Sequence, residues 1–388
     1  MHNTKLGDIC CFQSGGTPSR KNSSYYQGDI PWITTVSLTG GFIDENNAIE
    51  FITEQAIKES AAKIVPAKSI MVGTRVGVGK VAINNVPMST SQDIISLLFI
   101  DETKWNKEFL CKFITAKNAY LNSQARGATI KGIKIEILAN LFVPEISVEE
   151  QKNISIILDK VQSVIELRKQ QLQQLDDLVK ARFVEMFGEV GTNEKGWGLS
   201  KLSSCCQVNP KKTKDDRLVP GLMVSFVPMP AVSEKGDIDA SEIRRYDEVK
   251  TGFTYFSEND VLFAKITPCM ENGKGAVARN LYNGIGFGST EFHVLRPLRD
   301  VCNPYWLYTL TSFKQFRVDA ESNMTGSAGQ KRVPGSFLES YMVSIPPIEL
   351  QNQFAAFVEQ VDKSKVAVQK ALDEAQILFD SLMQEYFG

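Results

Sequence analysis

Two similar stretches lie 200 residues apart in this sequence: VEEQKNISIILDKV at residues 148–161 and IELQNQFAAFVEQV at residues 348–361. Both begin with an apolar residue, Glu, any residue and Gln, and both continue as a long run with apolar residues at helical spacing. Each run extends to a Phe-Gly pair, at residues 187–188 and 387–388. The chain therefore carries one pattern twice, which is the first sign of an internal duplication.

The similarity continues outside the two runs. ATIKGI (128–133) lies opposite AGQKRV (328–333), which pairs Lys131 with Lys331, and nearer the start the offset drifts as insertions in loops would cause. The matching stretches there are KLGDIC (5–10) with KLSSCC (201–206), SIMVGTR (69–75) with DVLFAKI (260–266), and TSQDIISLLF (90–99) with STEFHVLRP (289–297). We predict a tandem duplication of one unit of about 190 to 200 residues.

Each unit has two parts. Its first part holds short β-rich runs such as SIMVG, DVLFA and EFHVLRP, broken by Gly, Pro and Asn, and these predict a mixed α/β (α+β) domain. Its second part is a single long helix, whose start is indicated by the S-x-x-E pattern at Ser147 in one copy and by Pro346-Pro347 in the other. The predicted segments are a first domain at 1–147, a long helix at 148–188, a second domain at 189–345 and a second long helix at 346–388.

The apolar residues of the two helical runs follow alternating steps of four and three. From Ile154, eight of ten such positions are apolar, and nine of ten are apolar from Phe354. This spacing predicts the seam of a coiled coil. Helices of about 40 residues are about 60 Å long, too long for one small domain's face, so we expect them to pair antiparallel with one domain at each end, rather than to be two unrelated amphipathic helices. The predicted seam residues are Ile154, Leu158, Val161, Leu172, Leu175, Val179, Phe354, Val358, Val361, Leu372, Phe379 and Leu382.

The composition is that of a globular protein outside the membrane. Hydrophobic residues make up 43% and no apolar stretch is long enough to span a bilayer. The first residues, MHNTKLGDICC, lack the apolar region of a secretory signal, so we expect a cytoplasmic protein. The seven cysteines form no C-x-x-C pair, which indicates buried, reduced thiols rather than a disulfide framework or a zinc site.

Catalytic signatures are weak. The chain has two histidines, His2 and His293, which argues against a histidine-based triad or metal cluster, and we expect His293 to be a packed strand residue. GTRVGVGKV (73–81) lacks the Ser or Thr that follows Gly-Lys in a phosphate-binding loop and predicts a glycine-rich hairpin. GIGFGST (284–290) is interpreted as a turn. Asn303-Pro304-Tyr305 resembles half of the Asn-Pro-Pro-Tyr motif of amino-methyltransferases, but one proline is missing and chance explains it better.

Basic residues on the predicted loops are the remaining candidates for function. The net charge of −2 gives no overall electrostatic case for nucleic acid, so DNA binding would need local basic residues or a partner that supplies phosphate contacts. Taken singly, each such residue is most often a solvated surface charge. Repetition of a lysine at the same place in both units favours a ligand-binding role for the pair Lys131 and Lys331. The candidates for DNA binding are Arg20, Lys21, Arg75, Lys80, Lys131, Lys265, Lys274, Lys331 and Arg332.

The combination of motifs resembles the specificity subunit of Type I restriction-modification enzymes over essentially the whole chain. In the first unit the matching residues are LGDI (6–9), SGGTPSR (14–20), GDIPWI (28–33) and the VEEQKNI run. In the second they are STEFHVLRP (289–297), TGSAGQKRVP (325–334) and IPPIELQNQF (345–354), followed by the Phe-Gly helix end. ATIKGI in the first unit is a looser version of the Gly-Gln-Lys-Arg signature, without its Gly and Gln.

The resemblance implies a non-catalytic DNA-recognition subunit. Each domain would be a target recognition domain for one half of a bipartite sequence in double-stranded DNA, and the antiparallel coiled coil would set the distance between the halves. The domain–helix junctions would dock two methyltransferase subunits, joined by motor-nuclease subunits in defence against foreign DNA. S-adenosylmethionine, ATP and Mg would be bound by those partners, and no cofactor or metal by this chain.

Two alternatives stay open on the sequence. A self-contained DNA methyltransferase or nuclease would require a cofactor motif, which the residues do not supply. A coiled-coil scaffold without direct DNA readout would leave the paired basic, glycine-rich loops unexplained.

Overall fold

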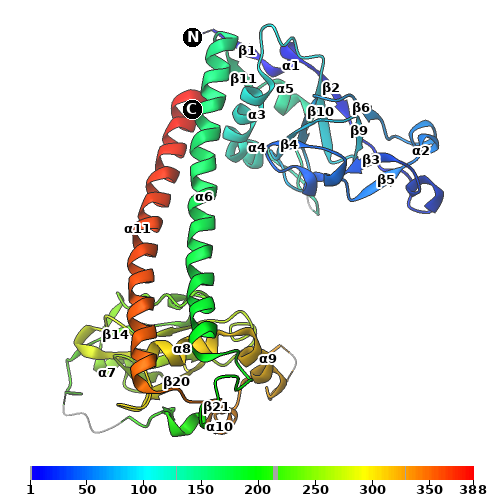
Figure 1. Cartoon of the computed structure of the whole chain (residues 1–388). Coiled ribbons are helices and arrows are strands. Elements are labelled where there is room, and N and C mark those ends of the chain that lie inside the picture. The colour runs from blue at the N-terminus through cyan, green and yellow to red at the C-terminus, as the bar shows by residue number, and fades with distance from the viewer. Residues whose placement is uncertain (1, 128, 213–216, 328) are drawn as a thin grey trace. The chain divides into compact units, whose positions relative to one another are not determined.

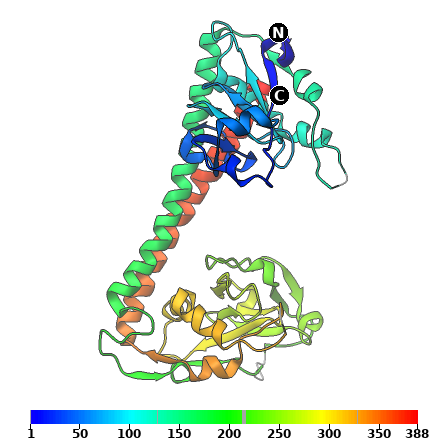
Figure 2. The same ribbon diagram turned by 90° about the vertical axis from the view of Figure 1, so that its right-hand side faces the viewer.

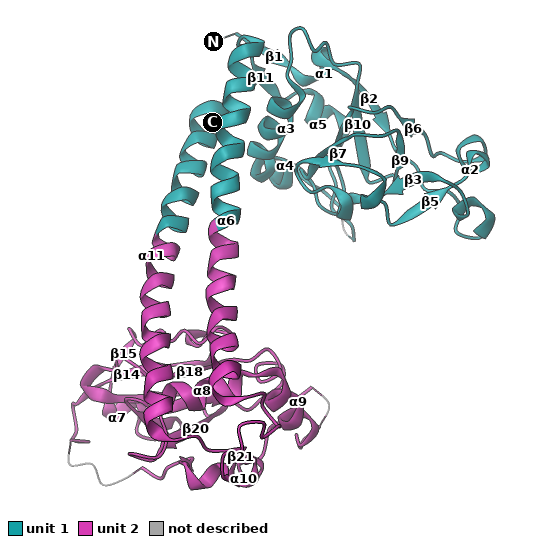
Figure 3. Cartoon of the chain, in the orientation of Figure 1, with its two compact units in different colours: residues 1–167, 371–388 teal, residues 168–370 magenta. Residues whose placement is uncertain are grey.

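The computed structural model describes residues 2–127, 129–212, 217–327 and 329–388. The chain divides into two compact units, residues 1–167 with 371–388 (unit 1) and residues 168–370 (unit 2) (Figure 3). The division falls inside the two long helices, so each unit contains a sheet domain together with part of both helices. Each helix end shares a hydrophobic core with a sheet domain, so each unit holds parts of both long helices.

Unit 1 is built on two sheets and a two-stranded ribbon (Figure 1). The larger sheet has the order β2 (Cys11–Ser14), β10 (Ile94–Leu98), β7 (Ile70–Gly73), β8 (Val81–Asn84) and β4 (Phe42–Ile43). The second has the order β5 (Glu50–Ile52), β3 (Ile30–Ile33), β9 (Met88–Thr90) and β6 (Ile64–Val65). The ribbon pairs β1 (Asn3–Lys5) with β11 (Phe142–Pro144), and the helices are α1 (Leu6–Ile9), α2 (Glu54–Glu59), α3 (Lys107–Ala116), α4 (Asn118–Gln124) and α5 (Ile135–Ala139).

Unit 2 repeats this topology. One sheet has the order β13 (Cys206–Val208), β20 (Phe292–Pro297), β17 (Val261–Ala264) and β18 (Gly275–Val277). The other has the order β15 (Ile243–Arg245), β14 (Met223–Val227), β19 (Ile285–Gly288) and β16 (Thr254–Ser257). The ribbon pairs β12 (Leu199–Lys201) with β21 (Met342–Ser344), and the helices are α7 (Tyr246–Val249), α8 (Pro304–Ser312), α9 (Lys314–Ser322) and α10 (Gly335–Ser340).

The strand pairing confirms the predicted duplication at the level of topology. β7 and β17 hold the same place, as do β10 and β20, and the parallel pair β3 with β9 corresponds to the parallel pair β14 with β19. Unit 1 adds the edge strand β4, which pairs parallel with β8 and has no counterpart in the described sheet of unit 2. These are the strands in SIMVGTR, DVLFAKI, TSQDIISLLF and STEFHVLRP that the sequence comparison paired. The pairing of ATIKGI with AGQKRV includes residues 128 and 328, which lie outside the described residues.

The long helices are α6 (Val148–Phe187) and α11 (Ile348–Phe387). The N–H of Glu150 donates to the hydroxyl of Ser147 at 3.2 Å, so Ser147 caps α6 as predicted. Helix α11 begins at Ile348, directly after the two prolines rather than on them. Within each unit the two helices lie side by side in both views (Figures 1 and 2).

Each unit buries the start of one long helix against the end of the other. In unit 1, Ile154 and Leu158 of α6 share a core with Phe379 and Leu382 of α11. In unit 2, Val179 of α6 shares a core with Phe354 and Val358 of α11. The pairing inside each unit is therefore antiparallel. The other predicted seam residues, Val161, Leu172, Leu175, Val361 and Leu372, are buried or half-buried, and none is exposed.

One position of the predicted seam is occupied by Lys365 instead of an apolar residue. Its ammonium group lies 2.6 Å from the carboxylate of Asp176 on α6, and both side chains are largely buried. A charged pair inside an apolar seam is satisfied in one register of the two helices and left unpaired in others. We infer that Lys365 and Asp176 help to fix the helix register in unit 2.

A buried glutamine joins each long helix to the sheet domain before it. Gln151 accepts a hydrogen bond from the N–H of Asn106 at 2.8 Å and donates to the carbonyl oxygens of Lys104 and Ile146, both at 2.9 Å. Gln351 does the same with the N–H of Asn303 at 2.8 Å and the carbonyl oxygens of Val301 at 3.0 Å and Pro346 at 2.8 Å. Both glutamines are fully buried.

The structure corrects two local expectations and explains a third. GIGFGST is not a turn: residues 285–288 form β19, a buried inner strand, where a Cβ on Gly286 would lie 2.1 Å from the Phe256 ring. Among the cysteines, which form no disulfide among the described residues, Cys11 is exposed and Cys269 half-buried, so not all the thiols are buried. Asn303 caps α8 by accepting the N–H of Tyr305 at 2.9 Å, so Asn-Pro-Tyr has a helix-capping role.

We predict that replacing Gln351 with Leu lowers the free energy of unfolding by about 2–4 kcal/mol, because it leaves a buried N–H and two carbonyls unpaired. Urea unfolding followed by circular dichroism measures the loss. The same change at exposed Gln353 is the control and should alter the free energy by less than about 0.5 kcal/mol. Equal effects at the two positions would contradict a structural role for the Gln351 amide.

Candidate nucleic-acid interface

The repeated basic segments form the same small hairpin in both units. In unit 2, Thr325 and Arg332 exchange backbone hydrogen bonds at 2.9 and 2.8 Å, and the N–H of Val333 donates to the carbonyl of Lys265 at 2.9 Å. In unit 1, Arg126 and Gly132 exchange the equivalent bonds at 2.9 and 3.0 Å. There the N–H of Ile133 donates to the carbonyl of Thr74 at 2.9 Å.

The strand edge beneath each hairpin is also equivalent. The N–H of Thr74 donates to the carbonyl of Asp93 at 2.8 Å, and that of Lys265 donates to the carbonyl of Glu291 at 2.9 Å. Asp93 directly precedes β10, and Glu291 directly precedes β20. The geometry therefore brings three separate segments together in each unit: the hairpin, the loop after β7 or β17, and the residue before β10 or β20.

Three exposed cations of unit 1 lie on this arrangement. Arg75 and Lys80 lie in the loop between β7 and β8, which is the glycine-rich hairpin predicted from GTRVGVGKV, with Gly77 and Gly79 at positive φ. Lys131 lies in the small hairpin, and all three cations are exposed. They form no ion pair among the residues that the structure describes.

In unit 2, most of the predicted DNA-binding residues are less exposed than Arg75, Lys80 and Lys131 of unit 1. Lys331 is exposed, whereas Lys265 and Lys274 are half-buried and the ammonium of Lys274 lies 3.5 Å from the carbonyl of Met229. Arg332 binds both carboxylate oxygens of Glu291, at 2.8 and 2.9 Å. That hydrogen bonding holds the pKa of Glu291 below its usual value and raises the pKa of Arg332.

The N-terminal candidates lie apart from the hairpin in the sequence and differ in their contacts. Arg20 forms two bonds to Glu50, at 2.5 and 2.7 Å, and its guanidinium lies 4.3 Å from the centre of the Tyr26 ring. Lys21 is exposed, with no ion pair in the described part of the chain. Arg20 is thus committed to an intramolecular pair, and Lys21 is the more available cation.

Sequence reasoning missed the acidic residues that organise this region. Glu291 neutralises a predicted DNA-binding arginine, and its partner lies 41 residues away, so no local pattern indicates the pair. Arg126 was also missed, although it forms one side of the unit 1 hairpin. Its place beside the repeated ATIKGI segment was the one available signal.

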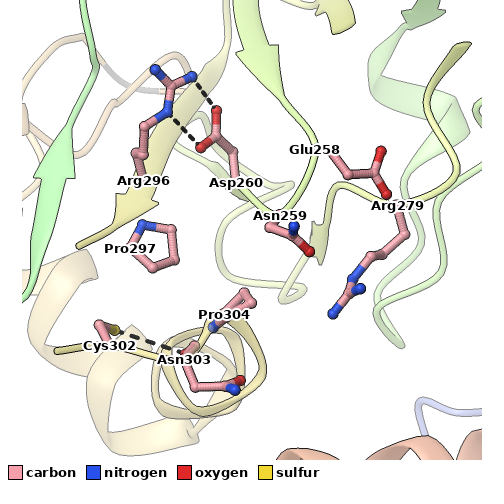
Figure 4. A pocket seen from close by; sticks show the side chains of 9 residues that line it. All are labelled: Glu258, Asn259, Asp260, Arg279, Arg296, Pro297, Cys302, Asn303 and Pro304. Carbon is pink, nitrogen blue, oxygen red and sulfur yellow. Dashed lines mark hydrogen bonds and ion pairs between the residues drawn. The ribbon is translucent and has the colours of Figure 1, made fainter. Parts of the chain in front are cut away.

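A polar pocket of about 350 Å³ lies in unit 2 (Figure 4). Arg296 binds the buried carboxylate of Asp260 at 2.6 and 2.8 Å, and Glu258 accepts the N–H groups of Asn280 and Leu281. Hydrogen bonding to Cys205 and burial raise the pKa of the Cys302 thiol in the pocket wall, which makes it a poor nucleophile. These groups hold the fold together, and they form no arrangement of nucleophile and base.

His293 is a buried residue of β20, as predicted. Its Nε2–H donates to the carbonyl of Val333 at 2.8 Å, and its Nδ1 accepts from the amide of Asn209 at 2.8 Å. Burial, the main cause, lowers its pKa. His293 therefore supports the base of the unit 2 hairpin in its neutral form.

The described parts of the chain also lack two features that would suggest other functions. Residues 2–127, 129–212, 217–327 and 329–388 contain no group of three or more His, Cys, Asp or Glu side chains placed to hold a metal ion. No helix among these residues is long and apolar enough to cross a membrane.

We predict that acid weakens unit 2 through His293. The unfolded chain binds a proton at the ordinary histidine pKa near 6.5, whereas the folded chain resists protonation, so stability present above that pH is lost as pH falls through the lowered pKa. Urea midpoints between pH 7.5 and 5 should fall further for the parent chain than for His293→Gln, in which the amide can still donate to Val333. Parallel pH profiles would contradict the prediction.

Comparison with known proteins identifies the family. The model of the Type I restriction modification DNA specificity domain matches residues 1–177 and 194–376. The EcoAI specificity subunit of Escherichia coli is 39% identical over 194 residues, which cover 48% of this chain and 32% of that protein. The MjaIX specificity subunit of Methanocaldococcus jannaschii is 30% identical over 222 residues, or 53% of this chain and 51% of that protein. The matches thus span between a third and a half of these relatives.

Solved structures share the fold. An S subunit from M. genitalium aligns over 100% of this chain and 96% of its own length, with a TM-score of 0.55 and 13% identity. A chain from a structural study of the type I R-M system aligns over 100% and 97%, with a TM-score of 0.60 and 17% identity. The family match covers most of both units, and the chain therefore belongs to the family of Type I restriction modification DNA specificity domains, of which it carries two in tandem.

Proposed function

We propose that this chain is the sequence-specific DNA-recognition subunit of a Type I restriction-modification complex, and that it catalyses no reaction itself. Each unit reads one half of a bipartite target in double-stranded DNA. The observation that carries the proposal is the hairpin that both units build with the same backbone bonds, each presenting an exposed lysine at the same place, Lys131 or Lys331. Two equivalent cationic loops suit two separate contacts to a duplex better than one active site.

The paired helices are the proposed spacer. Antiparallel packing within each unit, the four-three spacing of the seam and the absence of exposure at all twelve seam residues support a coiled coil along α6 and α11. A helix of 40 residues is about 60 Å long. Major grooves that face one side of DNA recur every ~34–36 Å, so such a coil would hold two reading domains one to two turns apart.

Two copies of one methyltransferase subunit are the proposed partners. Each unit exposes a large apolar residue at the same two places: Phe142 and Met342 in the ribbons, 56% and 52% exposed, and Leu378 and Leu178 on the long helices, 50% and 47% exposed. Repeated exposed apolar positions suit two equivalent docking sites. S-adenosylmethionine would then be held by these subunits, and ATP and Mg by motor-nuclease subunits, in the cytoplasm.

Selection from a pool of random-sequence duplexes tests the proposal, with the chain alone and with its methyltransferase partner. We expect the complex to select a split motif with a fixed gap. Selection of no sequence in either form would point to a coiled-coil scaffold instead. Binding of S-adenosylmethionine by the purified chain alone would point to a self-contained methyltransferase. Either result would overturn the proposal.

The spacer is tested by inserting four residues into both helices, after Leu167 and after Lys370. The insertion adds about 6 Å to the coil, so the gap in the methylated motif should lengthen by one to two base pairs, or about 3.4 Å each. Sequencing of methylated DNA from cells that express the complex measures the gap. The same four residues inserted in the exposed loop between Thr251 and Gly252 should leave it unchanged. An unchanged gap after the helix insertions would refute the spacer.

A further inference from the structure

The two hairpins differ in how each provides a guanidinium at one shared backbone bridge. In unit 1 the bridge joins Arg75 to Gly132, and in unit 2 it joins Ile266 to Arg332. The arginine therefore comes from the loop after β7 in unit 1 and from the hairpin itself in unit 2. A Cβ on Gly132 would lie 2.7 Å from the side chain of Arg75, so the glycine gives the arginine room to cross the hairpin.

The arginine of unit 2 forms three side-chain hydrogen bonds within the protein. Its Nε and Nη2 donate to the two carboxylate oxygens of Glu291, and its Nη1 donates to the carbonyl of Gln330 at 3.2 Å. A bidentate pair of this kind fixes the plane and direction of the guanidinium. It pairs the charge of Arg332 with a carboxylate inside the protein and leaves one N–H on Nη1 and one on Nη2 outside these bonds.

Bonds on both sides of Lys331 hold its backbone in place. Arg332 is held by Glu291 on one side and by its two backbone bonds to Thr325 on the other, and the carbonyl of Lys331 accepts the N–H of Thr267 at 3.1 Å. The backbone of Lys331 is thus fixed while its side chain stays exposed. In the described part of unit 1, no corresponding N–H donates to the carbonyl of Lys131, and the carboxylate of Asp93 forms no ion pair or hydrogen bond.

We infer that Glu291 is a positioning residue for DNA readout by unit 2: through Arg332 it holds the hairpin so that Lys331 meets the duplex already ordered. The inference rests on the proposed function and deepens it. A contact that is ordered before binding loses less conformational entropy when the complex forms. Unit 1 has no such ion pair, so its half-site should depend on the exposed cations Arg75 and Lys131 and should not respond to changes at Glu291.

The test uses the full chain in complex with its methyltransferase partner and the selection from random duplexes. Glu291→Gln and Arg332→Gln should each relax base preference in one half of the split motif and weaken binding about three- to tenfold. Lys331→Ala should relax the same half, and Lys131→Ala the other half. The charge-swapped double variant E291R/R332E should restore both affinity and preference to within about twofold.

Asp93→Asn is the matched control, because Asp93 holds the place of Glu291 in unit 1 and its carboxylate has no side-chain partner among the described residues. The Asp93→Asn complex should select the same two half-sites, with the same base preference, as the parent complex. The Glu291 and Arg332 side chains are partly exposed, so melting temperatures should stay within about 2 °C of the parent. Unchanged selection by E291Q and R332Q, equal loss in both halves, or no rescue by the swap would overturn the inference. If the parent selects no split motif, the proposed function fails first, and the inference falls with it.

Discussion

The amide of one buried glutamine determines where each long helix begins relative to its sheet domain. Gln151 and Gln351 each form hydrogen bonds with one backbone N–H and two backbone carbonyls that no helix or strand pairs. The N–H and one carbonyl belong to the segment before α3 or α8. The other carbonyl belongs to the residues just before the long helix. A shift of the helix by one residue would turn the side chain by about 100° and leave three buried polar groups unpaired. The helix therefore leaves the domain in one register.

In each unit, the end of one long helix packs beside the start of the other. In unit 1, the last turns of α11 pack beside the start of α6, and Phe387 reaches the rings of Phe109 and Phe113 at 5.2 and 6.1 Å. In unit 2, Phe187 at the end of α6 lies against Phe354 near the start of α11, with ring centres 5.6 Å apart. The phenylalanines of the two Phe-Gly pairs thus belong to hydrophobic cores of the sheet domains: Phe387 to that of unit 1, where α6 begins, and Phe187 to that of unit 2, where α11 begins.

The sequence predicts features that depend on period and misses those that depend on distant partners. The capping pattern at Ser147, the two prolines and the Phe-Gly pairs place the ends of both helices to within about two residues, and the offset comparison pairs the correct strands. GIGFGST was misread because its glycines look like turn residues, whereas they give space to the Phe256 ring and the Val227 carbonyl. The roles of Gln351 and Arg332 depend on groups 48 and 41 residues away, which spacing alone does not reveal.

Local electrostatics reconciles the net charge of −2 with the proposed contact to DNA. Ion pairs with Glu50, Glu291 and Asp260 neutralise Arg20, Arg332 and Arg296, so these arginines serve the fold. The cations that stay exposed and without an ion pair in the described chain, among those considered for DNA, are Lys21, Arg75, Lys80, Lys131 and Lys331. Affinity and its salt dependence both grow with the number of phosphates neutralised, so a few lysines per unit give weak binding with a modest salt dependence. Under the proposed function, partner subunits would supply most of the phosphate contacts, and the few exposed cations of this chain would act at the positions where sequence is read.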